Sequence, residues 1–482
     1  MFAFGFSFFI SLLLALRVES LTDPSQYPVC IIGAGPSGLT VAHELEARGN
    51  STVIFDSNAE VGGKCQSYYD DPIARTTYHA MGALIFTNQT YNNTLPLILE
   101  AGLPLSPALS PGPSANWNYW LYEAGAKGAQ SVTKLPFPNT TELFEILVEV
   151  NYYEFLWNEL FAPYSGSRYE GDICEEFTMP MKQWLFSKGF IKLPTFVELG
   201  LVYEGYGNIA QTPALYALQF LTPEILTYYL GTTPGYFVDF HKLWVWYAQN
   251  YVKGTIHSST NVSKIDRSGE YPIVTYNGPR ASSSSMQTCS SLIMAFPPTT
   301  RALKAAGLDF TDEEFDIFSN VGVTAYWAAA FKMDLPYPYA FLETPATPDF
   351  RPLAMLRYFN ESTISTAYSF GLSLYNETSA DSDEQVKQLL LSSANDLGTG
   401  LAQNRVGGVD SPITVSEADV KLLTRQDHFP HVLTEALQGG FYAKYNALQG
   451  QKKTYWTSGL DRFENIESAI RAAKDLVENV IF

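Results

Sequence analysis

Charged side chains are scarce in this chain of 482 residues, at 16%, against the roughly 25% of an average soluble domain. Lysine and arginine number 30 and aspartate and glutamate 49, which gives a net charge of −19. No basic run of any length occurs, so a nucleic-acid-binding function is excluded. We interpret the acidic balance as favouring solubility in an acidic or extracellular setting.

Cysteine is also rare, with four residues that lie far apart: Cys30, Cys65, Cys174 and Cys289. No pair has C-x-x-C spacing, which argues against a dithiol oxidase and against a zinc site. We therefore expect no metal. The spacing permits one disulfide but does not indicate which cysteines would form it.

Long apolar runs are absent except at the N-terminus, where Phe2 to Leu16 is apolar. A membrane span needs about 20 such residues, so we interpret residues 1–20 as a secretory signal with Val18 and Ser20 near the cleavage site. The run lacks a positively charged start, which leaves an uncleaved signal anchor as the alternative. After cleavage no stable membrane span is expected.

Sequons for N-glycosylation support a secreted protein or one in the lumen of the secretory pathway. The acceptor positions are Asn50, Asn88, Asn92, Asn139, Asn261, Asn360 and Asn376.

Aromatic residues are plentiful, at 14%. The chain is long enough for two or three domains and a large core. Some of the aromatic surface is ordinary core, and some could line an apolar ligand cavity.

The segment "PVCIIGAGPSGLTVAHELEARGNSTVIFD" predicts one βαβ unit. Val29 to Ile32 is a short apolar strand, an apolar helical stripe follows, and Thr52 to Phe55 forms the second strand. Between the first strand and the helix stands G-x-G-x-x-G, which is typical of dinucleotide binding.

Each glycine of this motif has a physical reason. Gly33 permits the tight turn, Gly35 lets the backbone approach a pyrophosphate, and Gly38 allows the helix to pack on the strand. The helix N-terminus near Ser37 offers free N–H groups to phosphate. Asp56 ends the second strand, where a carboxylate binds ribose hydroxyls.

A second glycine pair, Gly62 and Gly63, follows in "EVGGKCQSYY" with Lys64 beside it. It indicates a second turn for a long dinucleotide and resembles the Gly-Gly-Arg of the flavin amine oxidase superfamily, which implies FAD. Lys64 keeps the charge of that arginine but loses its two-pronged geometry. Cys65 is either a redox thiol or a small residue packed beside the cofactor, and we favour packing because no partner stands at C-x-x-C spacing.

Further segments are similar to the same superfamily. The resemblance implies that "HAMGALIF" passes the flavin, that "NVSKIDRS" contacts the adenine end, and that the N-terminus of the C-terminal helix, near Asn465, faces the flavin. The cofactor-binding residues implied by these segments are Met81, Gly82, Ala83, Val262, Gly459, Glu464 and Ile466.

Within the superfamily the chain most resembles the polyenoic fatty acid isomerases, on "VGGKC", "GYG", "PALYALQFL", "FPHV" and the C-terminal "YWTSGLDRFENIESAIRAAKDLV". A looser similarity extends to β-cyclopiazonate dehydrogenase-like oxidoreductases. The resemblance implies an enzyme whose flavin N5 takes a hydride from an activated C–H of an apolar unsaturated small molecule, with isomerisation of a polyenoic acid as one outcome. The alternative is an FAD-dependent oxidase or dehydrogenase of a secondary metabolite or an amine, with O2 as acceptor. A flavoprotein carrier without turnover is a third reading.

Few side chains can be given catalytic roles, because hydride transfer to flavin needs no obligatory protein base. Tyr206, Tyr216, Phe220 and Tyr228 either line a substrate tunnel or belong to the core. His431 is either an acid/base or a hydrogen-bonding group near the flavin. Tyr206 and His431 are the weak catalytic candidates.

The predicted fold class is α/β: a Rossmann-type, glutathione-reductase-like FAD-binding domain that is discontinuous in sequence, with an α+β substrate domain. We assign residues 26–95, 235–300 and 425–482 to the FAD-binding domain. Residues 96–234 and 301–424 form the predicted substrate domain.

Overall fold

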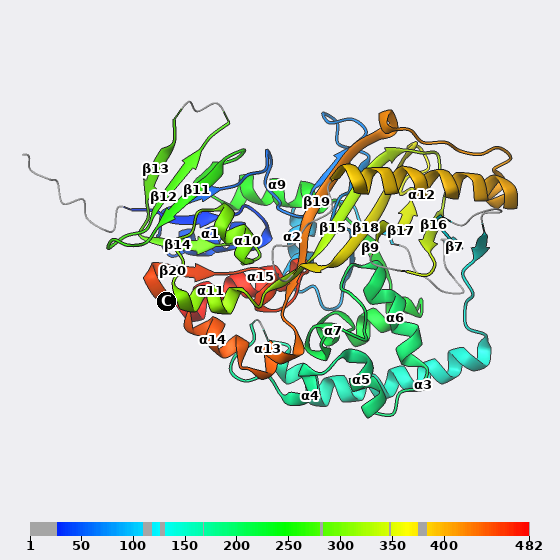
Figure 1. The fold of residues 1–482 in the computed structure, drawn as a ribbon, viewed down its shortest axis with the longest axis horizontal. Helices are drawn as coiled ribbons and strands as arrows, with labels where there is room; N and C mark the ends of the chain where they lie inside the picture. The colour runs from blue at the N-terminus through cyan, green and yellow to red at the C-terminus, as the bar shows by residue number, and fades with distance from the viewer. Residues whose placement is uncertain are drawn as a thin grey trace, which may run out of the picture.

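The computed structural model describes residues 27–108, 118–125, 131–166, 168–279, 283–346, 349–374 and 383–481. The predicted signal segment and the sequon at Asn376 lie outside these ranges. Figure 1 shows a parallel sheet and a small meander on one side, a large sheet under a long helix on the other, and a group of helices beneath the large sheet.

The parallel sheet has five strands in the order β10-β2-β1-β14-β20. Their bounds are Thr255–His257, Thr52–Phe55, Val29–Ile32, Ser291–Met294 and Thr454–Trp456. The central strands β1 and β2 are buried along their whole length, as uniformly apolar strands of a parallel sheet covered on both faces should be. They match the two predicted strands residue for residue.

Helices α1 (Pro36–Ala47) and α15 (Ile466–Asp475) pack against each other beside this sheet. Their apolar faces share a core with α9 (Phe240–Tyr251). The antiparallel meander consists of β11 (Asn261–Asp266), β12 (Ile273–Asn277) and β13 (Ser285–Thr288). The C-terminal helix therefore lies next to the first helix of the chain, at the edge where a dinucleotide would bind.

A seven-stranded sheet forms the second large unit, in the order β19-β15-β18-β17-β16-β7-β8. The bounds are Val420–His431, Gly322–Lys332, Ile364–Leu374, Asp349–Leu356, Tyr339–Glu343, Asn118–Tyr122 and Val132–Lys134. The long helix α12 (Asp383–Asn404) covers one face through Leu390, Ala394 and Leu397. β19 pairs with β15 from Val420 onward, so the predicted domain boundary at residue 425 falls inside one strand. The domain division stays a prediction.

Short helices form a separate layer under the large sheet (Figure 1). They are α3 (Thr140–Leu156), α4 (Glu175–Thr178), α5 (Met181–Ser187), α6 (Leu193–Tyr203), α7 (Ala214–Phe220) and α8 (Pro223–Tyr229). The other α-helices and strands of the described residues are α2 (Thr94–Glu100), β3 (Ser67–Tyr69), β4 (Tyr78–Ala80), β5 (Ile85–Thr87), β6 (Ser106–Pro107), β9 (Gly235–Phe237), α10 (Thr300–Ala305), α11 (Asp312–Phe318), α13 (Thr434–Gln438) and α14 (Phe441–Ala447).

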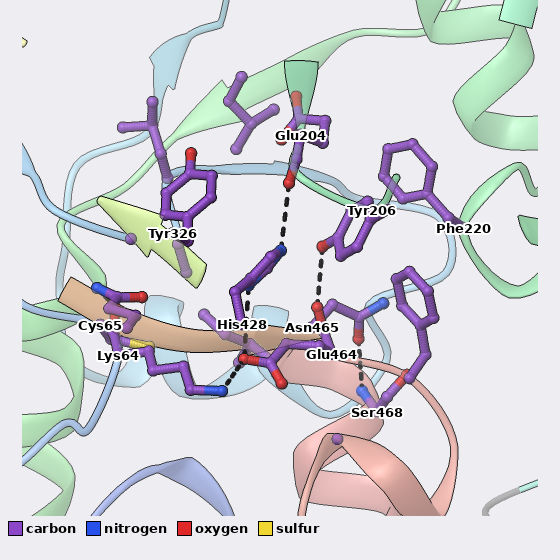
Figure 2. Close-up of a pocket in the computed structure, with 18 of the residues that line it drawn as sticks. Lys64, Cys65, Glu204, Tyr206, Phe220, Tyr326, His428, Glu464, Asn465 and Ser468 are labelled. Carbon is purple, nitrogen blue, oxygen red and sulfur yellow. Dashed lines mark hydrogen bonds and ion pairs between the residues drawn. The ribbon is translucent and has the colours of Figure 1, made fainter. Parts of the chain in front are cut away.

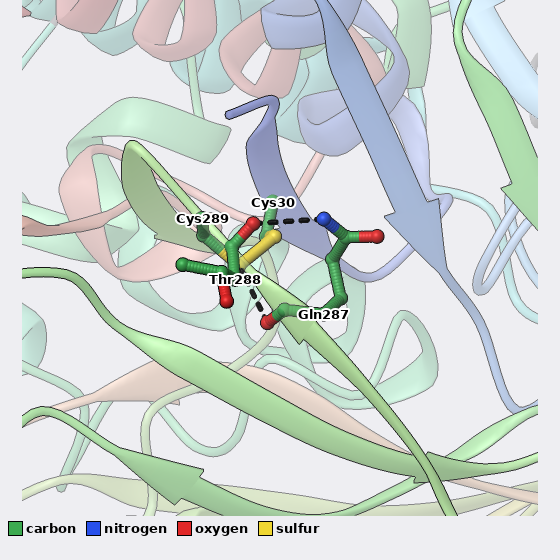
Figure 3. The surroundings of a disulfide bond; sticks show 4 residues. All are labelled: Cys30, Gln287, Thr288 and Cys289. Atoms are coloured by element: carbon green, nitrogen blue, oxygen red, sulfur yellow. Dashed lines mark hydrogen bonds between the residues drawn. A yellow bond between two sulfur atoms is a disulfide. The ribbon is translucent and has the colours of Figure 1, made fainter. Parts of the chain in front are cut away.

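A disulfide joins Cys30 on β1 to Cys289 just before β14, with the Cα atoms 5.5 Å apart (Figure 3). Both cysteines are fully buried. The bond links two neighbouring strands that lie 259 residues apart in the chain, a pairing that spacing alone could not indicate. Cys65 and Cys174 are free.

Within the described ranges no helix is long and apolar enough to cross a membrane, and no cluster of potential metal ligands occurs. Among the sequons that the structure describes, those at Asn92, Asn139, Asn261 and Asn360 are exposed, whereas Asn50 and Asn88 are half-buried. Glycosylation stays a prediction.

Candidate functional site

One continuous cavity of about 1700 Å³ is lined by residues of both large sheets and the helical layer. This exceeds the roughly 300–1,000 Å³ of an ordinary small-molecule pocket. We call its two parts the nucleotide half, around Gly35, Asp56 and Gly63, and the substrate half, around Glu204 and Tyr326. The volume suffices for a dinucleotide and a second molecule.

The glycines of the first turn have different surroundings. A Cβ on Gly33, whose φ is +110°, would lie 2.6 Å from the carbonyl oxygen of Ala295, and one on Gly38 would collide with the carbonyl of Gly33. A Cβ on Gly35 would meet nothing closer than 3.6 Å, at the Cα of Gly63. Packing therefore requires glycine at positions 33 and 38. At position 35 a side chain would instead occupy space in the cavity.

Asp56 connects the glycine turn to the end of β2. Its carboxylate accepts backbone N–H bonds from Ala34 at 2.6 Å and from Asn58 at 2.7 Å. Burial raises the pKa of Asp56, and these two N–H donors oppose the rise. The carboxylate lies in the cavity wall, where it can accept bonds from sugar hydroxyls.

The second glycine turn packs against the first. Gly62 and Gly63 have φ values of +114° and +55°, and a Cβ on Gly63 would lie 2.8 Å from the Cα of Gly35. No side chain caps the N-terminus of α1, which begins at Pro36. Its free N–H groups, the two glycine turns and Asp56 together fit an extended dinucleotide.

Lys64, which follows the second turn, forms an ion pair with Glu464 just before α15. Nδ1 of His428 lies 3.6 Å from the same carboxylate. Burial alone would raise the pKa of Glu464, but Lys64 and His428 outweigh it and lower the pKa to about 2. Glu464 is therefore a carboxylate at every physiological pH.

His428 lies between the two halves of the cavity, as Figure 2 shows. Its Nε2 is 3.2 Å from the backbone oxygen of Glu204, at the C-terminus of α6. A continuous set of contacts thus runs from Lys64 through Glu464 and His428 to Glu204.

Gly205 determines how the substrate half is built. Its φ is +78°, and a Cβ there would lie 2.8 Å from the ring of Tyr326. Glycine ends α6 in this way because it adopts positive φ without strain. The turn directs Tyr206 toward α15, where its hydroxyl donates to the backbone oxygen of Glu464 at 2.9 Å. The Tyr206 ring also contacts Phe220, with centroids 4.7 Å apart.

Glu204 lines the substrate half and has no hydrogen bond to its carboxyl group from any described residue. The side chain is accessible, but the surface that it presents is that of the cavity wall, deep in the protein. Burial raises its pKa to about 7. The sequence did offer one signal for Glu204: an acid at the end of an apolar helix, directly before the "GYG" segment.

The comparisons with known proteins agree with this geometry. Residues 31–100 match the model of an NAD(P)-binding Rossmann-like domain. An FAD-dependent oxidoreductase from Cochliobolus heterostrophus is 23% identical over 89% of this chain and 86% of its own length. The polyenoic fatty acid isomerase of Ptilota filicina is 24% identical over 54% of each chain.

Solved structures extend the likeness over almost the whole chain. The fatty acid isomerase from P. acnes superposes with a TM-score of 0.75 at 18% identity, covering 95% of this chain and 99% of the other. The chain has the fold of this isomerase. Putrescine oxidase gives a TM-score of 0.58 at 15% identity, covering 94% and 99%. The predicted fold class and the predicted resemblance to isomerases and amine oxidases are confirmed.

Most of the predicted site residues line the cavity. On the nucleotide side these are Gly33, Gly35, Ser37, Asp56, Gly63, Lys64, Gly82, Ala83, Val262, Gly459, Glu464 and Ile466, and on the substrate side Tyr206, Phe220 and Tyr228. Gly38, Gly62 and Met81 lie in the packed layer behind the wall. Their roles in cofactor binding stay predictions.

Tyr216 and His431 are not brought to the cavity. The Tyr216 hydroxyl contacts that of Tyr442 at 2.9 Å and accepts the backbone N–H of Val432. His431 is buried, stacks on Phe429 with centroids 4.4 Å apart, and has a pKa lowered to about 4 by burial. The Phe429 ring also contacts that of Tyr206, so it stands between both residues and the substrate half.

Cys65 lies in the cavity wall and is buried. Burial and then the negative charge of Glu464 raise the pKa of its thiol to about 12. Only a thiolate is nucleophilic, so Cys65 is a packed neutral side chain, in line with the preferred interpretation of the sequence.

Proposed function

We propose that this chain is an FAD-dependent enzyme that removes a hydride from an activated C–H bond of an apolar unsaturated small molecule. Double-bond isomerisation of a polyenoic acid is the leading form of this reaction. The observation that carries the proposal is a single cavity that joins a dinucleotide cradle to a chamber lined by aromatic rings.

FAD as the cofactor rests on two independent supports. Relatives that are named FAD-dependent oxidoreductases match about nine-tenths of the chain. The residues of the nucleotide half fit the cofactor, with an uncapped helix N-terminus, Gly35 open to the cavity and a buried Asp56. Bound FAD would supply the hydride acceptor, a chemistry that no side chain of the chain can provide.

The protein's own residues would then position charge and exclude water. Lys64 and Glu464 neutralise each other at the junction of the two halves. Tyr206 fixes the backbone of Glu464 through its hydroxyl. Asn465 caps α15 by accepting the N–H of Ser468 at 2.7 Å. Because α15 begins in the cavity wall, the positive end of its dipole lies at the cavity. The rings of Tyr206, Phe220 and Phe463 close the apolar wall.

A second candidate is oxidation of a secondary metabolite or an amine, with O2 as acceptor. Glu204 favours it, because a cationic amine binds well to a carboxylate surrounded by aromatic rings. Tyr228, Tyr229 and Tyr326 all line the cavity together with Glu204.

The decisive experiment is flavin bleaching under argon against polyenoic acids, amines and indole-type metabolites. An isomerase should turn over a polyene without oxygen, leave its mass unchanged and move a deuterium label within one molecule. An oxidase should release peroxide and a product lighter by two hydrogens. Reduction by simple amines with no reaction on any polyene contradicts the leading form, and no reduction by any class indicates a carrier.

Entry into the secretory pathway is proposed on the N-terminal apolar run and the sequons. The exposed positions of Asn139 and Asn360 support it. Expression in a eukaryotic host should give a product that loses mass on endoglycosidase treatment. An unglycosylated intracellular product contradicts this.

A further inference from the structure

The wall of the substrate half is not uniformly apolar. Among the described residues, the hydroxyl groups of Tyr91, Tyr119, Tyr229 and Tyr326 line the cavity and form no hydrogen bond with the protein. Burial raises the pKa of all four phenols, and the negative charge of Glu204 adds to each rise. Glu204 and four free hydroxyl donors therefore line the same cavity.

The protein itself leaves Glu204 unsatisfied. Its backbone oxygen contacts His428, but its carboxyl group has no partner in the described part of the chain. An ionised acid in a cavity wall without a partner is unfavourable once the cavity is filled and water is excluded, and its position at the C-terminus of α6 adds to the cost because that end of a helix repels negative charge. A bound molecule that donates a hydrogen bond to Glu204 would remove this penalty.

Other charged groups do not compensate Glu204. Lys64 is paired with Glu464, and His428 has its two nitrogens directed at Glu464 and at the backbone of Glu204. Tyr228 and Tyr229 of α8 and Tyr326 of β15 line the same cavity as Glu204 and carry neutral phenols. An anionic group placed here would meet a like charge whenever Glu204 is ionised.

We propose that Glu204, with the hydroxyl groups of Tyr229 and Tyr326, forms a subsite for a hydrogen-bond-donating head group of the substrate, an alcohol or an ammonium, and that this subsite discriminates against carboxylates. The inference rests on the proposed function only in taking this half of the cavity as the place where the substrate binds. It favours, among unsaturated substrates, those that carry a hydroxyl or amino group at this end, and a polyenoic acid would have to bind with its carboxylate elsewhere in the cavity.

The test compares three saturated probes of one chain length: octylamine, octanol and octanoate. Binding to the flavin-loaded enzyme is measured under argon at pH 8, from the change in the visible absorbance of the flavin. The wild type should bind octylamine and octanol at least tenfold more tightly than octanoate. Glu204→Gln, which has nearly the same shape, should reduce the ratio of octylamine to octanoate affinity at least tenfold while the flavin content stays unchanged.

The matched control is Glu343→Gln. Glu343 is also a buried carboxyl group with a raised pKa, of about 8, but it lies outside the cavity lining and near Arg351. This variant should keep the wild-type ranking of the probes. Equal or tighter binding of octanoate by the wild type, an unchanged ranking in Glu204→Gln, or no binding of any probe would overturn the proposal.

The outcome is separable from that of the proposed function, because the saturated probes have no allylic carbon. A clear head-group preference without turnover of any polyene would leave the subsite standing and refute the proposed reaction. Turnover of polyenes without a head-group preference would do the reverse. Reduction of the flavin by octylamine itself would support the subsite and select the amine branch.

Discussion

The two halves of the cavity are built in different ways. The nucleotide half is formed mainly by backbone, from two glycine turns within a segment of about 30 residues, to which Asp56 adds a carboxylate. The substrate half is formed by side chains from α6, α8, β15 and β19, which meet only in the folded protein. Function that is encoded in local backbone geometry is visible in a sequence, whereas function that is encoded by distant side chains is not.

The largest expected effect is a difference between valine substitutions at two glycines of the same motif, Gly35 and Gly38. Gly35→Val should fold but contain no FAD, because its Cβ would meet the protein only at an ordinary contact distance, 3.6 Å from the Cα of Gly63, and the side chain would fill the cavity. Gly38→Val should fail to fold stably, because its side chain would collide with the carbonyl of Gly33. Flavin absorbance of the purified proteins and their thermal unfolding distinguish the two results. A Gly35→Val protein that remains yellow would refute the role of this half.

The next effect concerns the stability of the parallel sheet that carries the nucleotide half. The disulfide between Cys30 and Cys289 closes a loop of 259 residues, and removal of a native disulfide typically costs about 2–5 kcal/mol. Replacing both cysteines by alanine should lower the free energy of unfolding by this order, measured with denaturant. Cys174→Ala is the control, because Cys174 is free. Equal stability of the two proteins would contradict the prediction.

The strands and helices of the nucleotide half could be predicted from the sequence, whereas only some of the residues that line the cavity could be. β1 and β2 were predicted because short apolar runs are local signals. The start of α15 near Asn465 was implied by the resemblance to the flavin amine oxidase superfamily. The Cys30–Cys289 bond and the Lys64–Glu464 pair could not be predicted, since the latter joins residues 400 positions apart. Tyr216 was expected at the tunnel because its helix is aromatic, but periodicity does not tell which ring faces a cavity and which packs in the core.

A smaller effect appears as a difference in pH dependence between the two halves. Glu204 has a pKa of about 7, against about 4.3 in an unfolded chain, so the folded protein binds more protons between these values. The contribution of Glu204 to stability therefore falls as the pH rises from about 4.3 to 7 and is constant above that. Glu464 behaves oppositely: its pKa is about 2, so its contribution is complete above about pH 5 and is lost only in strong acid.

Glu204→Gln should consequently gain thermal stability relative to the wild type on going from pH 5 to pH 8. The neighbouring titratable groups are His428, which contacts the backbone of Glu204, and the phenols of Tyr228, Tyr229 and Tyr326, which stay protonated in this range. Melting temperatures of both proteins at the two pH values measure the effect. An identical pH dependence would show that Glu204 does not titrate near neutrality.

The smallest effect is expected at Cys65, the cysteine that follows the second glycine turn. Its thiol, with a pKa of about 12, is not a nucleophile at neutral pH, and it has no cysteine within bonding distance. Cys65→Ser preserves the shape, and its hydroxyl can accept a hydrogen bond from the indole N–H of Trp244, which has no other partner in the described residues. Flavin content should be unchanged and turnover should stay within about threefold of the wild type, since burying a hydroxyl that finds a partner costs little. The measurement is single-turnover flavin reduction by the best substrate of the panel, with Cys174→Ser as the control. A variant that keeps its flavin but loses turnover would assign the chemistry to the thiol. An essential reactive side chain would then lie in the nucleotide half, which contradicts the view that this half is formed mainly by backbone.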